Sequence, residues 1–271
     1  MTQVADTAAP VTEDEDDEES GTSSPSRIDA YLPNRRDALY LLGGTLFGGL
    51  VGYEAAGFTS SQGAVAPDRV DSTVLTYKQA RAALEEGNAR YVAGQPLRPD
   101  QTLGRRAAVA TEQHPFAAVL SCADSRVAPE VLFDQGLGDL FVVRSAGQVV
   151  DRAVLGSLQY GVEHLAPPLL VVLGHSGCGA VKATLEAVKT KAKASGTAID
   201  DLVTAIKPAI TEAEEIGTDE KSFLDVATAL NVERVLEHLK ADPVVGGAVA
   251  KRKLKVVGAV YDLATGSLDW L

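Results

Sequence analysis

Cysteine is scarce in this chain, and an excess of positive charge is missing. Only two cysteines, Cys122 and Cys178, occur among the 271 residues. Two thiols allow one disulfide or part of one metal site, and because they form no C-x-x-C pair they do not favour a thiol redox protein. The net charge of −12 counts against a nucleic-acid-binding protein, since such proteins present a basic surface to the phosphates.

The acidic charge is concentrated at the start of the chain. Residues 1–30 hold nine acidic residues against one base, Arg27, and almost no large apolar side chains. Such a segment cannot bury enough apolar surface to offset the entropy lost on ordering, so we predict that it is disordered. The remaining length suffices for one sizeable α/β domain with appendages.

Residues 31–66 have the layout of an export signal. The pair Arg35-Arg36 precedes an apolar run over residues 38–58 and resembles the twin-arginine signal, although the residues after the pair depart from the usual pattern. The run is long enough to remain as a membrane anchor, and cleavage near residue 66 is the other outcome. A buried helix of the domain is the structural alternative. We expect an exported protein that is periplasmic, on the cell surface or secreted, with or without an anchor.

The folded domain is predicted to occupy residues 72–271. Short apolar runs alternate with stretches of helical periodicity, which is typical of βαβ units and a parallel sheet. We therefore expect an α/β fold whose mostly parallel five-stranded sheet is flanked by helices. The predicted strands cover Phe116–Ser121, Leu140–Arg144, Leu169–Leu173, Lys253–Tyr261 and Ser267–Leu271, and the predicted helices cover Tyr77–Ala93 (with Thr76 as N-cap), Val150–Leu165, Asp200–Glu215 and Asp219–Leu239.

Reactive side chains follow two of the buried strands. Cys122 follows the first strand, and His175 and Cys178 follow the third in the stretch G-H-S-G-C-G. Ligands of an open α/β sheet bind beyond the carboxyl ends of its strands, so these three side chains are expected to meet at one rim. Two thiolates and one imidazole form the ligand set of a zinc site with an open fourth position.

Asp124 and Arg126 lie two residues apart, so they share a face if the segment is extended. An arginine beside an aspartate keeps the carboxylate ionised, and an ionised carboxylate only accepts hydrogen bonds. Next to a zinc-bound water, whose pKa the metal lowers toward about 7, such a carboxylate would orient the nucleophile.

Two stretches of the sequence, C-A-D-S-R-V from Cys122 and G-H-S-G-C-G-A-V from Gly174, resemble the two motif blocks of β-class carbonic anhydrases. The resemblance runs from about Tyr77 to Leu271. It implies a zinc lyase (a carbonate dehydratase) that hydrates carbon dioxide reversibly to bicarbonate and a proton, with zinc hydroxide as the nucleophile.

The same resemblance implies roles for individual residues. Cys122, His175 and Cys178 match the zinc ligands, and Asp124 and Arg126 match the catalytic pair. In an inactive form known in the family the matching aspartate leaves the arginine and becomes the fourth ligand, so Asp124 is also a conditional metal ligand.

A substrate pocket and an assembly are implied as well. Gln113 lies where one branch of the family has a glutamine near the substrate, and Phe141 and Tyr160 resemble apolar pocket residues that a neighbouring subunit can supply. A homodimer or a higher homo-oligomer is therefore expected. The chain has Ser145 and Gln148 in R-S-A-G-Q where the family often has R-N-A-G-N, so local hydrogen bonding there is expected to differ.

Other interpretations of these residues stay open at this point. The same scaffold with zinc hydroxide would also suit hydrolysis of carbon disulfide or carbonyl sulfide. A non-catalytic zinc- or bicarbonate-binding protein is a second alternative. Cys122 and Cys178 would form a structural disulfide in a third, with Asp124 and Arg126 as a structural ion pair.

Overall fold

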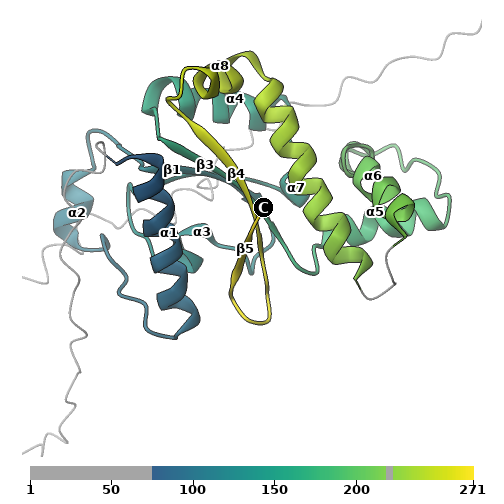
Figure 1. The fold of residues 1–271 in the computed structure, drawn as a ribbon, viewed down its shortest axis with the longest axis horizontal. Helices are drawn as coiled ribbons and strands as arrows, with labels where there is room; N and C mark the ends of the chain where they lie inside the picture. The colour runs from purple at the N-terminus through teal and green to yellow at the C-terminus, as the bar shows by residue number, and fades with distance from the viewer. Residues whose placement is uncertain (1–74, 218–221) are drawn as a thin grey trace, which may run out of the picture. The chain divides into compact units, whose positions relative to one another are not determined.

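The computed structural model describes residues 75–217 and 222–271, which belong to the unit Ser60–Leu271 (Figure 1). The acidic segment 1–30, the export segment 31–66 and the predicted start of the domain near residue 72 lie outside the described residues. Within the described part of the chain, no helix is both long enough and apolar enough to cross a bilayer.

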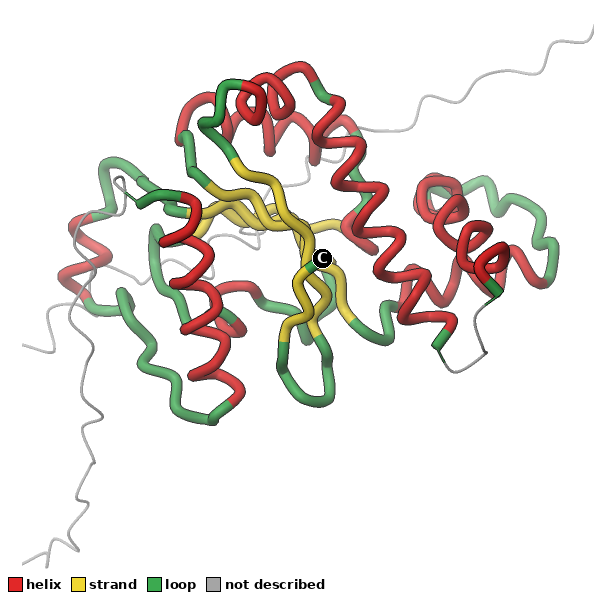
Figure 2. Tube along the Cα trace, in the orientation of Figure 1, coloured by secondary structure: helices red, strands yellow, loops and turns green. Residues whose placement is uncertain are grey.

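A five-stranded sheet forms the middle layer of this unit (Figure 2). The strand order is β2-β1-β3-β4-β5, in which neighbours among the first four strands run parallel and β5 runs antiparallel to β4. The predicted fold, a mostly parallel five-stranded sheet with flanking helices, is therefore confirmed. The strands are β1 (Ala117–Cys122), β2 (Leu140–Ser145), β3 (Leu169–His175), β4 (Lys255–Tyr261) and β5 (Leu268–Trp270).

Helices cover both faces of the sheet, which explains why β1 and β3 are buried at every position. On one face, α1 and α3 contribute Ala80, Leu84 and Leu132 to the apolar core. On the other face, α4, α7 and α8 pack against the sheet through side chains such as Val154, Val232 and Val245. The helices are α1 (Tyr77–Val92), α2 (Leu103–Ala108), α3 (Pro129–Leu132), α4 (Arg152–Tyr160), α5 (Gly179–Lys189), α6 (Ile199–Ile216), α7 (Phe223–Ala241) and α8 (Pro243–Ala250), with the short turns η4 (Ala146–Gln148) and η5 (Gly161–Leu165).

A third apolar cluster lies beyond the carboxyl ends of the strands. It is formed by α5, α6 and the first part of α7, which pack against η4 and against Cys122 and Cys178. Figure 1 shows α5 and α6 side by side next to the lower end of α7. This cluster buries the rim of the sheet where the sequence predicts the metal site.

The predicted α1 is confirmed, including its N-cap. The Thr76 side chain accepts the Gln79 amide and the Gln79 side chain accepts the Thr76 amide, so both ends of a capping box are present.

The predicted single helix over Val150–Leu165 is wrong in its start and its form, while its predicted end at Leu165 is the end of η5. Asp151 accepts the Val154 amide as N-cap, so α4 begins only at Arg152. After Tyr160 the winding widens into the π-turn η5. Gly161 begins this turn, where a Cβ would lie 2.9 Å from the Phe141 ring, so the close approach to β2 requires glycine.

Several other boundaries differ from the prediction by one or two residues. β4 begins at Lys255 instead of Lys253, because the chain turns at Arg252, whose φ is 57°. The structure describes α7 from Phe223 onward, while the predicted start at Asp219 lies outside the described residues.

Candidate metal centre

Three buried side chains converge where β1 and β3 end. Cys122 is the last residue of β1, His175 is the last of β3, and Cys178 directly precedes α5. Their exposed fractions are 5%, 0% and 3%, and their ligand atoms all lie within 4.8 Å of one another. Because β1 and β3 are adjacent parallel strands, their carboxyl ends lie at the same edge, as the sequence pattern predicted.

The turn between His175 and Cys178 is fixed to the neighbouring strand. The Ser176 amide donates to the Tyr261 carbonyl at 2.9 Å, and the Ser176 hydroxyl accepts the Leu263 amide at 2.9 Å. Gly177 adopts φ 62°, a conformation that side chains disfavour, and this lets the chain reverse toward the sheet. The turn therefore aims the imidazole and the second thiol at one point.

His175 has one occupied and one free ring nitrogen. Nδ1 lies 3.0 Å from the Ser176 carbonyl oxygen, which only accepts, so Nδ1 donates and Nε2 is the nitrogen left to bind a metal through its lone pair. Nε2 is fully buried and has no hydrogen-bond partner among the described residues. A buried lone pair of this kind fits a metal ion, and a backbone carbonyl on the other nitrogen is the usual second partner of a metal-bound histidine.

The two thiols differ in their environments. The hydrogen bond from Cys178 is the largest cause that lowers the pKa of Cys122, followed by the neighbouring His175 and the Gly147 amide at 3.3 Å, and together these outweigh burial. The pKa of Cys178 is raised, because Cys178 donates to Cys122 and is itself buried. A divalent cation between the two sulfurs would stabilise both as thiolates. Together with the free Nε2 atom, this donor set fits zinc.

Asp124 and Arg126 form a bidentate ion pair beside these ligand atoms. Arg126 Nε lies 2.9 Å from Oδ1 and Nη2 lies 2.8 Å from Oδ2, while the Arg126 amide donates to Oδ1 at 2.9 Å. These bonds hold the pKa of Asp124 well below its usual range. Oδ2 lies 3.9 Å from Nε2 of His175, so the ionised carboxylate faces the cluster while both its oxygens stay on Arg126.

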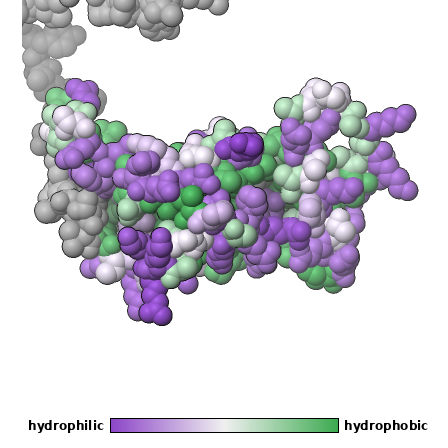
Figure 3. All heavy atoms as spheres, turned by 90° about the horizontal axis from the view of Figure 1, so that it is seen from above, coloured by the Kyte–Doolittle hydropathy of each residue, from purple (hydrophilic) through white to green (hydrophobic). Residues whose placement is uncertain are grey.

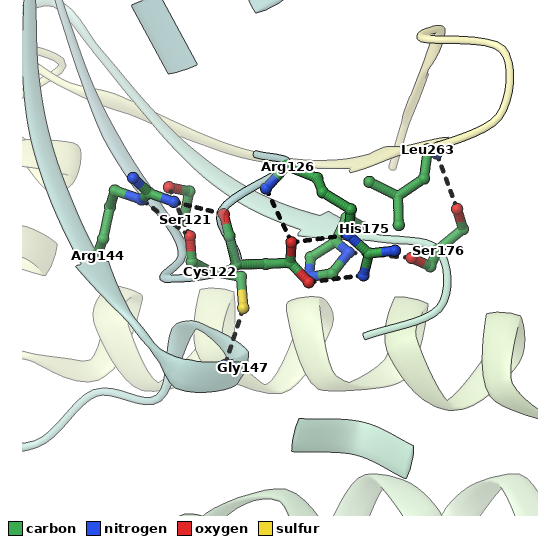
Figure 4. Close-up of polar contacts among 9 residues, drawn as sticks. Ser121, Cys122, Arg126, Arg144, Gly147, His175, Ser176 and Leu263 are labelled. Carbon is green, nitrogen blue, oxygen red and sulfur yellow. Dashed lines mark hydrogen bonds and ion pairs between the residues drawn. The ribbon is translucent and has the colours of Figure 1, made fainter. Parts of the chain in front are cut away.

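Arg144 is a residue of this site that the sequence analysis missed. Its Nε donates to the Cys122 carbonyl at 3.0 Å and its Nη2 donates to the Asp124 carbonyl at 2.6 Å (Figure 4). The side chain thereby fixes the backbone on which a thiol and the carboxylate are mounted. Its place one residue before the end of β2, the neighbour of β1, was the available signal.

The three predicted substrate-pocket residues lie apart from this cluster within the chain. Phe141 pairs with Ala118, four residues before Cys122 on β1, which is about 13 Å along the strand. Tyr160 packs against Phe141 with 6.3 Å between ring centroids and is 48% exposed. Gln113 is exposed in the loop before β1.

Two sizeable cavities lie elsewhere in the described unit. One of about 670 Å³ and another of about 570 Å³ flank the loop before β4, near Lys253 and Leu254. Lys253 lies just before the first residue of β4, at the amino-terminal edge of the sheet, whereas the cysteines lie at the carboxyl-terminal edge. The reactive side chains indicate the site better than cavity size does. Among the described residues, two thiols, an imidazole and an ion pair meet only at the carboxyl-terminal rim of the sheet.

Comparison with known proteins gives a consistent result. The family model described as carbonic anhydrase matches residues 117–268. A carbonic anhydrase of Mycolicibacterium smegmatis is 46% identical over 188 residues, which cover 69% of this chain and 89% of that protein. Carbonic anhydrase 2 of Mycobacterium tuberculosis is 43% identical over 185 residues, covering 68% and 87% of the two chains.

Solved structures agree with the sequence relatives. One of two tetrameric β-carbonic anhydrases from Sordaria macrospora superposes with a TM-score of 0.57 at 27% identity, covering 72% of this chain and 97% of that one. A Coccomyxa β-carbonic anhydrase in complex with acetazolamide gives a TM-score of 0.55 at 27% identity, covering 72% and 82%.

Proposed function

Because this chain belongs to the carbonic anhydrase family, we propose that it is a β-class, zinc-dependent lyase that hydrates carbon dioxide reversibly to bicarbonate and a proton. The observation that carries the proposal is the buried cluster of Cys122, His175 and Cys178 with the Asp124–Arg126 pair beside it. These three side chains are the zinc ligands in this proposal. Zinc, when bound, supplies a Lewis acid that makes a water molecule nucleophilic near neutral pH.

Asp124 and Arg126 act as the catalytic pair. Arg126 occupies both carboxylate oxygens, so Asp124 stays ionised across the pH range of the reaction and only accepts hydrogen bonds. An acceptor 3.9 Å from Nε2 of His175 is placed to take a hydrogen bond from a nucleophilic water and to turn its lone pair toward carbon dioxide. To serve as a fourth ligand, Asp124 would have to turn at least one oxygen from Arg126 toward the cluster.

The apolar end of the substrate pocket comes from a neighbouring subunit in this proposal. Phe141 and Tyr160 lie against each other on one face of the chain, and Tyr160 is half exposed. A relative whose structure superposes on this chain is tetrameric, which supports a homo-oligomer here. Gln113, exposed before β1, would meet the substrate in the same way.

Stopped-flow carbon dioxide hydration on the full zinc-loaded chain tests the proposal. We expect fast hydration that a chelator abolishes and added zinc restores. Hydrolysis of carbonyl sulfide or carbon disulfide without carbon dioxide hydration would identify the sulfur substrate instead. Zinc binding with neither reaction, from neutral to alkaline pH, would leave a binding protein and contradict the proposal.

We also propose that residues 31–66 direct export, with the apolar run 38–58 either cleaved off or retained as an anchor. The arginine pair before the run supports this. Fractionation of cells that express the full chain or its Arg35→Lys, Arg36→Lys variant tests it. Export of the wild type and retention of the variant in the cytoplasm are expected, whereas equal distribution of the two would contradict it.

A further inference from the structure

A buried asparagine on α7 reaches the loop that contacts the Cys122 sulfur. Asn231 is 3% exposed, and its Nδ2 donates to the Gly147 carbonyl at 3.0 Å. Gly147 lies in η4 and donates its own amide to Cys122 Sγ at 3.3 Å (Figure 4). Two hydrogen bonds in series therefore join the middle of α7 to one of the proposed zinc ligands.

Gly147 needs an external restraint to hold its amide in that direction. Its φ of 64° and ψ of 23° are left-handed, and a Cβ there would lie 2.7 Å from Ile206 Cδ1. The position thus requires glycine, which is also the residue with the greatest backbone freedom. The Gly147 amide and the Gly147 carbonyl belong to the two peptide groups on either side of its Cα. Apart from its bond to the sulfur, the group that carries the amide is held among the described residues only by the long bond from the Val149 amide to the Ala146 carbonyl, at 3.4 Å. A bond that holds the Gly147 carbonyl limits rotation about the Gly147 backbone and so helps to fix the direction of the amide.

No other polar side chain of α7 shares this task. Gln148, the next residue of η4, is 1% exposed, yet neither amide atom has a hydrogen-bond partner among the described residues. Thr228, one turn before Asn231 on α7, also has a buried hydroxyl without a partner in the described part of the chain. Among the described residues, the hydrogen bond from Asn231 to the Gly147 carbonyl is therefore the one that connects α7 to η4 and restrains Gly147.

We propose that Asn231 is a positioning residue for the metal centre, which limits rotation of the backbone at Gly147 so that the Gly147 amide donates to the Cys122 thiolate. An amide donor reduces the charge that a thiolate sulfur carries and fixes the direction of its remaining lone pairs. Outer partners of metal ligands typically change metal affinity by about 10- to 100-fold when they are lost. The inference rests on the proposed function, because it takes Cys122 as a zinc ligand.

The test compares Asn231→Leu and Asn231→Asp with matched changes at Asn88. Asn88 on α1 is 7% exposed, and its Nδ2 also donates to backbone carbonyls. The acceptors are the carbonyl oxygens of Leu132 and Gly266, in two segments that pack against α1. Asn88→Leu and Asn88→Asp therefore remove the same kind of buried bond without touching the metal centre.

The first readout is the zinc dissociation constant of the full chain, measured by competition with a chelator. We expect it to rise about 10-fold or more in the Asn231 variants and to stay within about 2-fold in the Asn88 variants. The second is the thiolate-to-cobalt charge-transfer absorption of the cobalt-substituted protein, which is expected to shift in the Asn231 variants alone. Equal zinc affinity and equal cobalt spectra in the two sets would overturn the inference.

A measurement on the wild type covers the case in which the Asn231 variants do not fold. Hydrogen exchange of the Gly147 amide is expected to be slow, because the amide is bound to sulfur and its carbonyl is held. Exchange at the rate of an open amide would overturn the inference. A folded wild type that binds no zinc would overturn the proposed function and this inference with it, so the two failures are distinguishable.

Discussion

At Asp124, the geometry separates two roles that one carboxylate could have in this site. Arg126 holds both oxygens at 2.8 and 2.9 Å, and the pKa of Asp124 is lowered because of these bonds. Asp124 Oδ2 is 3.9 Å from His175 Nε2, so the carboxylate contacts the cluster but is too far away for a hydrogen bond to the imidazole. The arrangement is that of an acceptor beside the metal site and not of a ligand within it.

Asp124→Asn should separate catalysis from metal binding. The amide keeps the shape of the carboxylate but can also donate, so it no longer forces the nucleophile to donate to it. We expect carbon dioxide hydration to fall roughly 100-fold while zinc content stays near that of the wild type. Stopped-flow rates and metal analysis on the same samples check this, and loss of zinc in the variant would show instead that Asp124 holds the metal.

Cys178→Ser should remove the metal. A serine hydroxyl is not deprotonated near neutral pH, so the variant keeps one thiolate and one imidazole. We expect the zinc affinity to fall by about 100-fold or more, beyond the loss typical of an outer-shell change. A chelator competition measures it, and unchanged affinity would contradict the proposed ligand set.

At the scale of elements, β3 and α7 pack so closely that the strand needs glycine before the histidine. A Cβ on Gly174 would lie 2.6 Å from Val232 Cγ2 and 3.3 Å from Thr228 Cγ2. The close approach places α7 directly behind the metal-binding rim. It also brings Asn231 within reach of Gly147.

Gly174→Ala should therefore destabilise the protein, by about 1–3 kcal/mol as for overpacked cores. The matched control is Gly156→Ala in α4, where a Cβ would meet nothing within 4 Å. There we expect an increase in stability of up to about 1 kcal/mol, because alanine favours the helix more than glycine does. Urea unfolding of both variants checks the pair, and equal stabilities would contradict the packing argument.

Asp134 connects α1 to the loop that follows it. Burial raises the pKa of Asp134, but hydrogen bonds from Arg90 at 2.6 Å and from the Leu97 and Arg98 amides outweigh burial, so the pKa lies below its usual value. A lowered pKa in the folded state means that the carboxylate contributes stability above the unfolded pKa of about 4. That contribution is lost as the pH falls from there through the folded value.

Asp134→Asn should thus cost about 1–3 kcal/mol at pH 7, as when a buried acceptor loses its hydrogen bonds, because the Arg90 side chain is partly exposed. The difference from the wild type should shrink as the pH falls below about 4. Unfolding curves at a series of pH values measure both, and a difference that stays constant down to pH 3 would contradict the assigned cause.

Most elements and the rim could be predicted from the sequence, because their signals are local. Apolar runs marked β1 and β3, and the side chains that follow each strand marked the metal site. Contacts between distant segments left at most a weak signal, such as the place of Arg144 near the end of a strand. Arg144 reaches the Cys122 carbonyl from another strand, and Asn231 reaches Gly147 across 84 positions of sequence. The π-turn η5 likewise depends on the Phe141 ring that packs against Gly161.

At the scale of the whole molecule, the proposed pocket is incomplete without a second copy of the chain. Hydrophilic side chains cover much of the face that carries α8, with smaller apolar patches among them (Figure 3). Within one chain, Phe141 and Tyr160 lie apart from the metal cluster. Activity should therefore depend on assembly.

Tyr160→Asp should weaken assembly and activity together, because a charge placed on an apolar contact must be desolvated when the subunits meet. The control is Ile199→Asp on α6, at another apolar side chain that is 62% exposed. We expect sedimentation to give a mass that is a multiple of 28.3 kDa for the wild type and the control, and a smaller mass with lower activity for Tyr160→Asp. Unchanged mass and rate in Tyr160→Asp would contradict the shared pocket.

We propose above all that Cys122, His175 and Cys178 bind zinc together, and X-ray absorption at the zinc edge of the full chain reports the ligands themselves. We expect one zinc per chain with two sulfur ligands at about 2.3 Å and nitrogen or oxygen ligands at about 2.0–2.1 Å. A first shell without sulfur would contradict it. So would a chain that takes up no zinc and contains Cys122 and Cys178 as a disulfide.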